Sequence, residues 1–346
     1  YRQSLFGYNS LKWDKRIEPV RYQEAKKSYV ETLELVSANA INKFFALATA
    51  QSNYDIASFN YANADTLYRY AQGRYNIGTI TENEMLQLEL NRLTEETNRM
   101  NARIEMDNCM QELRSYLGIQ EEREIRVRVS SRIPDFSINL NEALALAYEN
   151  SPDIQTMKRR KLESESAVAR ARANAGLKAD IYLRFGLTQT ADKLPEAYRN
   201  LLDQQYVSLS ISLPILDWGR GKGQVRVARS NRDLVYTQVE QSRTDFELNV
   251  RKLVKQFNLQ TQRVRIAART DETAQRRNEV ARKLYILGKS TILDLNASIS
   301  EKDSARRNYV SALYNYWSLY YTLRSMTLYD FESNKLLTED YNLLIE

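Results

Sequence analysis

The sequence contains no histidine and only one cysteine among its 346 residues. Histidine is the most common general base and the most common metal ligand in proteins, so its absence removes the usual basis for acid–base catalysis and for a metal site. Cys109 lies in a helical stretch with apolar neighbours, where a lone cysteine is usually a small core residue. We therefore expect no enzyme activity, no catalytic residue, no bound metal and no cofactor.

Glycine and proline are scarce, with ten and five copies. Neither occurs from Val20 to Gln72 or from Gln224 to Leu287. As one helix, the second interval (287 − 224 + 1 = 64 residues) would extend about 95 Å at a rise of 1.5 Å per residue. Helices of globular proteins rarely exceed about 25 residues, so these intervals predict a coiled coil, a bundle or a tube. Coiled-coil steps of four, three and four residues appear at Phe246, Val250, Leu253 and Phe257.

Long apolar runs are also missing: none approaches the roughly twenty residues of a membrane-spanning helix. Charged residues reach 27% and the net charge is only +6, so both signs are mixed along the chain. This composition is typical of long helices with narrow apolar stripes. The densest basic cluster, 158–161, is followed by Glu163 and Glu165 and is most simply a solvated helix face. No basic groove with interleaved aromatic residues indicates nucleic-acid binding.

One short pattern occurs twice. Tyr75-Asn76-Ile77-Gly78-Thr79 recurs as Tyr285-Ile286-Leu287-Gly288-Lys289, and both the tyrosines and the glycines are 210 positions apart (285 − 75 = 288 − 78 = 210). An acid follows each glycine by six positions, first Glu84 and then Asp294. A fixed offset shared by separate anchors predicts a duplicated structural unit.

Each copy is predicted to run from a strand into a very long helix, through a glycine turn, and back along a second long helix. We place the first repeat at 1–135 and the second at 136–346. A unit with this much helix and so little strand cannot close its own core, so the two repeats are expected to form one body.

Strict alternation of apolar and polar residues predicts strands at about 1–8, 179–190 and 206–216. One interpretation is a small soluble sheet with one face on a hydrophobic core. The other is a membrane barrel whose apolar residues face lipid and whose polar residues face a watery lumen, closed by further chains because lone strands cannot hide their edges. In the barrel the candidate lumen residues are Arg184, Ser208, Ser210 and Ser212.

Three features together carry a family resemblance: the stretch Leu140-Asn141-Glu142-Ala143-Leu144-Ala145-Leu146-Ala147-Tyr148-Glu149-Asn150-Ser151-Pro152-Asp153-Ile154, the strand exit Leu213-Pro214-Ile215-Leu216-Asp217-Trp218-Gly219-Arg220, and the two glycine turns. In these the chain resembles the outer-membrane efflux proteins, the TolC-like ducts. The resemblance implies a mainly α fold with a small β part. Each protomer of a homotrimer would give four strands to a twelve-stranded outer-membrane β-barrel and long antiparallel coiled-coil helices to a periplasmic tunnel.

The same resemblance implies a location and partners. The location is the outer membrane of a Gram-negative bacterium, with helices in the periplasm. The partners are outer-membrane lipid, a periplasmic membrane-fusion adaptor and an inner-membrane pump of RND, ABC or MFS type. Three strands are found where four are implied, so the chain is expected to begin inside a strand at Tyr1 and to be incomplete at its N-terminus. The alternative function is a soluble coiled-coil scaffold.

In this family the glycine turns lie at the tip where the tunnel is pinched shut. The resemblance makes Tyr285, Asp294 and Glu84 gate candidates, together with Ser290, which stands where the best-known members carry an arginine. Acids in the first turn of a helix are also favoured by the helix dipole without any further role. The candidate adaptor-docking residues flank the two turns: Gly78, Thr79, Ile80, Gly288 and Lys289.

Overall fold

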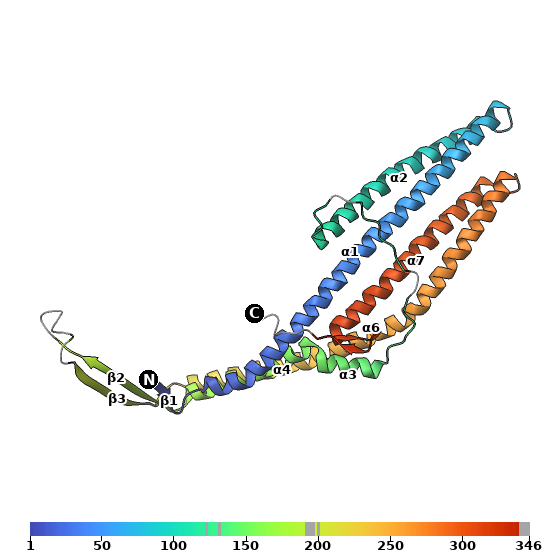
Figure 1. The fold of residues 1–346 in the computed structure, drawn as a ribbon. Coiled ribbons are helices and arrows are strands. Elements are labelled where there is room, and N and C mark those ends of the chain that lie inside the picture. The colour runs from blue at the N-terminus through green and yellow to red at the C-terminus, as the bar shows by residue number, and fades with distance from the viewer. Residues whose placement is uncertain (122–123, 131–132, 191–197, 199–200, 339–346) are drawn as a thin grey trace. The chain divides into compact units, whose positions relative to one another are not determined.

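The computed structural model describes residues 1–121, 124–130, 133–190, 198 and 201–338, which form long helices and a few strands (Figure 1). The chain divides into two compact units. The first contains Tyr1–Tyr29 and Tyr148–Asn249, and the second contains Val30–Ala147 and Val250–Glu346. These units do not coincide with the repeats proposed at 1–135 and 136–346, and that boundary stays a prediction.

The duplication appears in the helix lengths. Helices α1 (Ser10–Asn76) and α6 (Arg220–Ile286) are each 67 residues long, and α2 (Glu82–Leu117) and α7 (Ile292–Thr327) are each 36 residues long. Helix α6 begins 210 residues after α1, and α7 begins 210 residues after α2 (220 − 10 = 292 − 82 = 210). The predicted fold class, long paired helices in a duplicated unit, is confirmed.

The first unit contains a three-stranded sheet. Strands β1 (Arg2–Ser4), β2 (Lys178–Thr188) and β3 (Leu202–Ser212) form an antiparallel sheet in the order β1-β2-β3. Strand β3 begins before the predicted 206 because its first residues continue the backbone ladder to β2 down to Leu202 opposite Thr188. It ends at Ser212, shortly before Pro214, which has no N–H to donate to a ladder.

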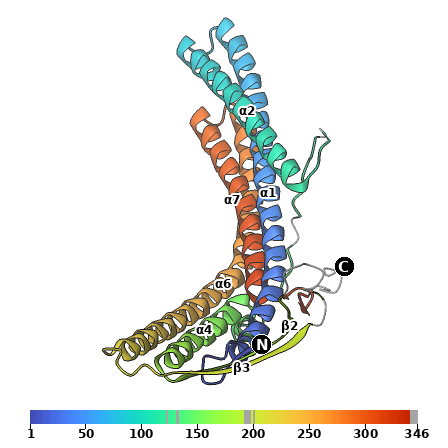
Figure 2. The ribbon, with the colours of Figure 1, turned by 90° about the vertical axis from the view of Figure 1, so that its left-hand side faces the viewer.

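Helix α4 (Pro152–Ala175) lies beside the first parts of α1 and α6 in the same unit (Figure 2). Ser151 accepts a hydrogen bond from the backbone N–H of Asp153 at 3.2 Å and so caps the start of α4. Arg159 of α4 bonds Glu24 of α1 at 2.6 Å, and Lys161 bonds Glu240 of α6 at 2.7 Å. Polar contacts therefore tie this three-helix layer together.

The second unit holds the two long helical hairpins, α1 with α2 and α6 with α7 (Figure 1). Its core contains Phe257, whose ring contacts the rings of Tyr316 and Tyr320 at a tilt, and all three side chains are at most 2% exposed. Helix α3 (Leu140–Asn150) precedes α4, and a short hairpin of β4 (Tyr329–Asp330) and β5 (Lys335–Leu336) follows α7. Within the described ranges, the helices lack the combination of length and apolarity needed to cross a bilayer.

Candidate functional site

Both hairpin turns have the same geometry. Gly78 and Gly288 adopt φ values of +72° and +68°, a left-handed conformation that glycine adopts without the clash a Cβ would cause. In the first turn the N–H groups of Gly78 and Thr79 donate to the carbonyls of Tyr75 and Arg74, each at 2.9 Å. The second turn repeats both bonds at 2.9 Å. These bonds satisfy carbonyl groups at the end of each long helix.

The two acids that follow the turns close capping boxes. Thr81 caps the start of α2, and its backbone N–H donates to the carboxylate of Glu84 at 3.0 Å. Thr291 caps the start of α7, and its hydroxyl donates to Asp294 at 2.7 Å while its own oxygen accepts from the N–H of Asp294 at 3.2 Å. Both acids therefore stabilise a helix start, and this structural role does not depend on a gate. Their role as a gate stays a prediction.

Asp294 is an exposed carboxylate with several donors around it. The hydroxyl of Ser290 donates to the same oxygen at 3.3 Å. The hydrogen bonds from Thr291, helped by Ser290 and the nearby charge of Arg277, hold the pKa of Asp294 below its usual value. Asp294 therefore carries its negative charge at neutral pH. Ser290, predicted as a gate residue, orients this acid and has no positive charge to pair with it.

Tyr285 lies between the two hairpins near their tips. Burial raises the pKa of its phenol, and its charged neighbours are Arg74 and Glu84 of the first hairpin. Its ring lines a cavity of about 180 Å3 together with Tyr70 and Leu295. Of the candidate gate residues, the structure thus brings Tyr285 near Glu84. Arg74 was not identified from the sequence, although it directly precedes the first copy of the repeated tyrosine.

The turn residues form an accessible surface. The docking candidates Gly78, Thr79, Gly288 and Lys289 are exposed, and Ile80 is half-buried. Two apolar side chains beside them were not identified as candidates: Ile77 is 74% exposed and Leu287 is 67% exposed. Both occupy the position just before a turn glycine, so the repeat itself contained the signal.

The strand pairing separates apolar from polar side chains. Ser208 pairs with Tyr182, Ser210 with Asp180, and Ser212 with Lys178. Because side chains alternate along a strand, these residues share one face, which also carries Arg184 opposite Tyr206. The predicted lumen residues therefore lie together on a polar face, where Arg2 also pairs with Asp180 at 3.6 Å.

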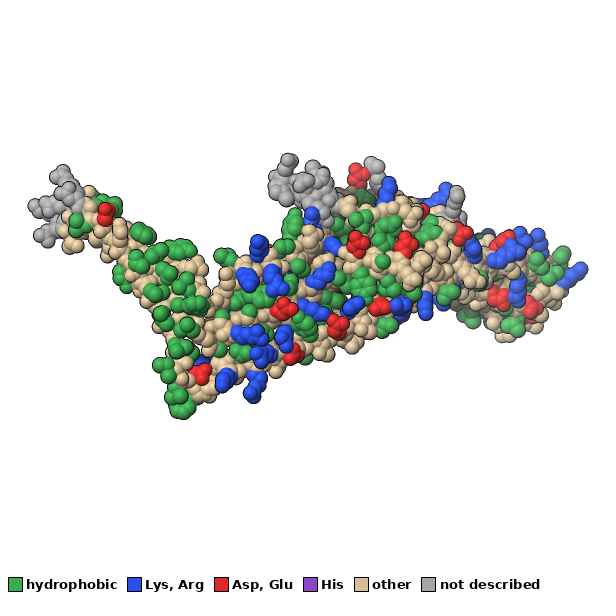
Figure 3. Space-filling view, turned by 90° about the horizontal axis from the view of Figure 1, so that it is seen from below, with side chains coloured by type: hydrophobic (Ala, Val, Ile, Leu, Met, Phe, Trp, Pro, Cys, Tyr) green, Lys and Arg blue, Asp and Glu red, His purple; other side chains and the backbone are tan. Residues whose placement is uncertain are grey.

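The opposite face of the strands is apolar and exposed. Val207, Leu209 and Ile211 of β3 are 69%, 60% and 67% exposed, and Phe185 of β2 is 69% exposed. Figure 3 shows hydrophobic side chains gathered over this part of the chain. The soluble-sheet interpretation needed these side chains to cover a core, and within the described part of the chain they cover none.

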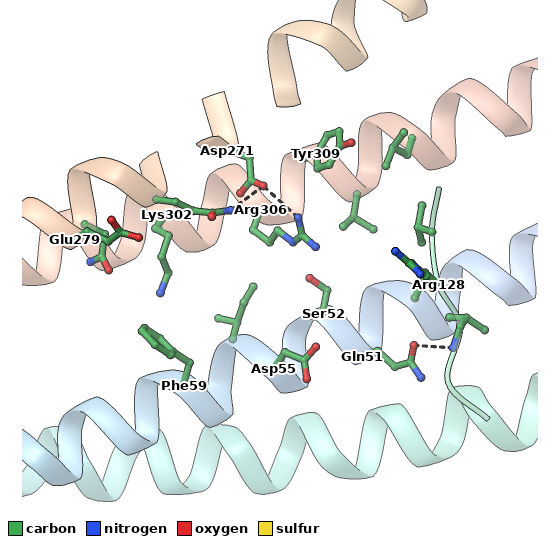
Figure 4. Close-up of a pocket in the computed structure, with 18 residues that line it drawn as sticks. Gln51, Ser52, Asp55, Phe59, Arg128, Asp271, Glu279, Lys302, Arg306 and Tyr309 are labelled. Carbon is green, nitrogen blue, oxygen red and sulfur yellow. Dashed lines mark hydrogen bonds and ion pairs between the residues drawn. The ribbon is translucent and has the colours of Figure 1, made fainter. Parts of the chain in front are cut away.

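A second cavity, of about 630 Å3, lies between the hairpins, and we call it the seam cavity (Figure 4). It is lined by α1, α6, α7 and residues 127–129 of the connector between α2 and α3, all in the second unit. At one wall Asp271, which is 5% exposed, accepts hydrogen bonds from Arg306 at 3.1 Å and Gln275 at 3.0 Å. The sequence pattern did not identify this cavity, because it forms only when helices far apart in sequence meet.

The chain is similar to several known proteins. It is 21% identical over 311 residues to outer membrane protein TolC of Escherichia coli strain K12, covering 87% of this chain and 61% of that protein. The structure resembles that of the Campylobacter jejuni CmeC outer membrane channel, with 16% identity, a TM-score of 0.78 and coverage of 99% of this chain and 72% of that one. For the outer membrane protein VceC of Vibrio cholerae the identity is 16%, the TM-score 0.73 and the coverage 94% and 77%.

The similar structures share the fold, and the chain spans 61% of the length of the TolC relative. The model of the outer membrane efflux protein family matches residues 143–327, more than half of the chain. That segment begins in α3 and includes the strand hairpin, α6, the second turn and α7. The chain therefore belongs to the outer membrane efflux protein family, and its location is the outer membrane.

Proposed function

We propose that this chain is the subunit of a passive exit duct: a homotrimer that crosses the outer membrane and carries cargo delivered by a periplasmic adaptor and an inner-membrane pump. The pump supplies the energy, and the duct supplies a water-filled path. The observation that carries the proposal is the strand hairpin, whose polar and apolar faces are both accessible in one chain.

The strand hairpin needs further strands in a membrane. The outer strands of the three-stranded sheet, β1 and β3, each leave one backbone edge without a strand partner among the described residues. Unpaired N–H and C=O groups cost several kcal/mol each in hydrocarbon, so strands span a bilayer only in closed barrels. Copies of the chain arranged around one axis would close the barrel, with Ile211 toward lipid and Ser210 toward water.

The helices support a ring of copies in the second unit. Helix α1 contacts α7 through Asn60 and Asp303, whose side chains are 2.7 Å apart, so α2 and α6 lie on the outer sides of the two hairpins. Both outer helices carry exposed apolar residues at coiled-coil spacing. On α2 these are Leu86, Leu90, Leu93, Met100 and Ile104, and on α6 they are Leu259, Ile266 and Val280.

These two stripes differ, so the contact between copies would be head to tail, with α2 of one copy against α6 of the next. A head-to-tail contact generates a closed ring when its rotation closes. A three-membered ring agrees with the trimer that the family resemblance implies.

The turns at the free ends of the hairpins would then converge near the axis. Three copies of Asp294, each kept ionised by its capping bonds, would concentrate negative potential and favour cations over anions. Tyr285, between Arg74 and Glu84, would couple the second hairpin to the first. The exposed Ile77, Thr79, Leu287 and Lys289 offer a mixed apolar and polar surface to an adaptor.

A planar-bilayer experiment tests this function. The purified protein should insert into the bilayer and conduct ions. Under a salt gradient, the reversal potential should indicate that cations permeate more readily than anions. Asp294→Asn should lower the cation-to-anion permeability ratio severalfold at low ionic strength, where the charge is least screened. Asp294→Glu keeps the charge and should preserve the ratio.

The possible failures are distinguishable. A protein that stays in the aqueous fraction and never conducts would contradict the duct. A conducting protein whose selectivity is unchanged by Asp294→Asn would keep the duct and remove Asp294 from the gate.

A further inference from the structure

The seam cavity is not explained by the gate or by the strand hairpin. Its volume of about 630 Å3 lies within the range of roughly 300–1,000 Å3 that binds drug-sized organic molecules. Helices α1, α6 and α7 and the connector build its walls, and the polar groups that they present decide which molecule fits.

Two guanidinium groups and a hydroxyl face the same space. In Figure 4, Arg306 of α7 points into the cavity from one wall and Arg128 of the connector from a second, while Ser52 of α1 points toward Arg306 from the third. A guanidinium presents five N–H donors in a planar fork that matches a carboxylate or phosphate group. The three groups together form a donor-rich pocket for an oxyanion.

These donors retain capacity for a ligand. Arg306 uses one nitrogen to bond Asp271 at 3.1 Å and keeps 45% of its side chain exposed. Arg128 has no hydrogen bond or ion pair with any residue in the described ranges. An anion entering the cavity would thus meet donors without displacing a partner of Arg128 among the described residues.

The position of Arg128 is fixed by its own neighbours. The side-chain amide of Gln51 in α1 donates to the carbonyl of Ile125 at 3.1 Å and accepts from the N–H of Val127 at 3.2 Å. These two hydrogen bonds hold the connector against α1. Arg128, the next residue, is therefore held at the cavity wall.

The remainder of the cavity is suited to an apolar body. Ile56 and Val310 line it, and the ring of Phe59 lies 4.4 Å beneath the ammonium group of Lys302. Acidic side chains also line the walls, so the basic and acidic charges balance and the lining has no excess positive charge to hold a polyanion. The charged lining residues are Arg128, Lys302, Arg306, Asp55, Asp271 and Glu279.

We propose that the seam cavity binds a small organic anion with one carboxylate or phosphate-like group, held by Arg128, Arg306 and Ser52, and an apolar body against Ile56, Phe59 and Val310. Such a ligand would contact the connector and both hairpins at once. The proposal does not depend on the duct function, because the cavity lies within one chain.

Equilibrium dialysis of the purified protein in a non-ionic detergent tests the proposal, with empty micelles as the blank. The probes are 1-naphthoate, the neutral 1-naphthalenemethanol and inorganic phosphate. We expect naphthoate to bind at least about tenfold more tightly than either of the others, because only it combines a charge-assisted contact with apolar burial. Equal binding of the alcohol would overturn the proposed anion contact, and tighter binding of phosphate would overturn the apolar part.

Variants assign the site. Arg128→Gln should weaken naphthoate binding by about tenfold or more. The matched control is Arg126→Gln on the same connector, since Arg126 pairs with Glu124 at 3.7 Å and does not line the cavity. Because Arg306 also neutralises the buried Asp271, it is tested in the double variant Asp271→Asn/Arg306→Gln, which leaves no unpaired buried carboxylate. Unchanged affinity in both cavity variants, or no naphthoate binding by the parent protein, would contradict the proposal.

Discussion

Leu328 ends α7 in a left-handed conformation, with φ of +46°, at the position that Gly118 fills at the end of α2 with φ of +69°. A side chain in this conformation costs about 1–2 kcal/mol. Leu328 is only 3% exposed, and burying a leucine side chain contributes about 1.5–3 kcal/mol, so burial offsets the strain. The two copies therefore end the same helix with different residues.

Glu24 is expected to stabilise the folded protein in a way that depends on pH. It accepts hydrogen bonds from Arg159 at 2.6 and 3.0 Å and from Thr156 at 2.8 Å. The bonds from Arg159 hold the pKa of Glu24 below its usual value. Glu24→Gln should lower the unfolding free energy by about 2 kcal/mol at pH 7, because hydrogen bonds to charged groups are lost.

The effect should depend on pH with a defined sign. A lowered folded-state pKa gives stability that is complete above the unfolded value, about 4.3 for glutamate, and is lost as pH falls through the lower folded value. The melting-temperature difference between parent and Glu24→Gln should thus shrink in acid. Glu18→Gln is the control, since the exposed Glu18 pairs only locally with Arg21. An equal loss at pH 7 in the control would contradict the argument.

At the same scale, the site residues could be predicted only in part. Glu84, Asp294 and Tyr285 belong to a local pattern that occurs twice, and the family resemblance made them candidates for a gate whose role stays a prediction. Arg74 was missed because its importance comes from contact between hairpins, which no local pattern records. Arg128 was missed for the same reason, since its place depends on Gln51 holding the connector.

At the scale of elements, the helices were predictable because their signals are local. The scarcity of glycine and proline marked most of α1 and α6, and the two glycine turns marked where these helices end. The start of β3 was less predictable, because pairing with β2, rather than its own alternation, extends it to Leu202.

Glycine substitutions test the turn geometry. Gly288→Ala should destabilise by about 1–2 kcal/mol because a Cβ is strained at φ of +68°. Gly73, inside α1, has open space around its Cα and no positive φ, so Gly73→Ala should stabilise by about 0.5–1 kcal/mol. Melting temperatures of the purified variants measure both changes. Shifts of the same sign would contradict this assignment.

At the scale of the whole molecule, the apolar stripes of α2 and α6 predict which residues meet between copies. Leu86 lies eight residues after Gly78 and Val280 eight before Gly288, while Met100 and Ile266 each lie 22 residues from their turns (100 − 78 = 288 − 266 = 22). Copies with level turns would bring Leu86 opposite Val280 and Met100 opposite Ile266.

Cysteine pairs at these positions should form disulfides between copies. In a Cys109→Ser background, Leu86→Cys/Val280→Cys and Met100→Cys/Ile266→Cys should give covalent trimers on non-reducing gels. The mismatched pair Leu86→Cys/Ile266→Cys separates its partners by 14 helical residues, about 21 Å, and should not cross-link. Cross-linking by the mismatched pair, or a lack of cross-linking by both matched pairs, would contradict the contact between α2 and α6.

The equal lengths of the paired helices restrict how relatives of this chain can change in size. Inserting one residue into α1 alone would turn everything beyond it by about 100° and raise one tip above the other. Seven residues restore nearly the same face, but the returning helix and both helices of the second copy must then gain seven as well. Insertions and deletions in this part of the gene should therefore occur as four matched heptads, so that all four helices of the two hairpins change length together.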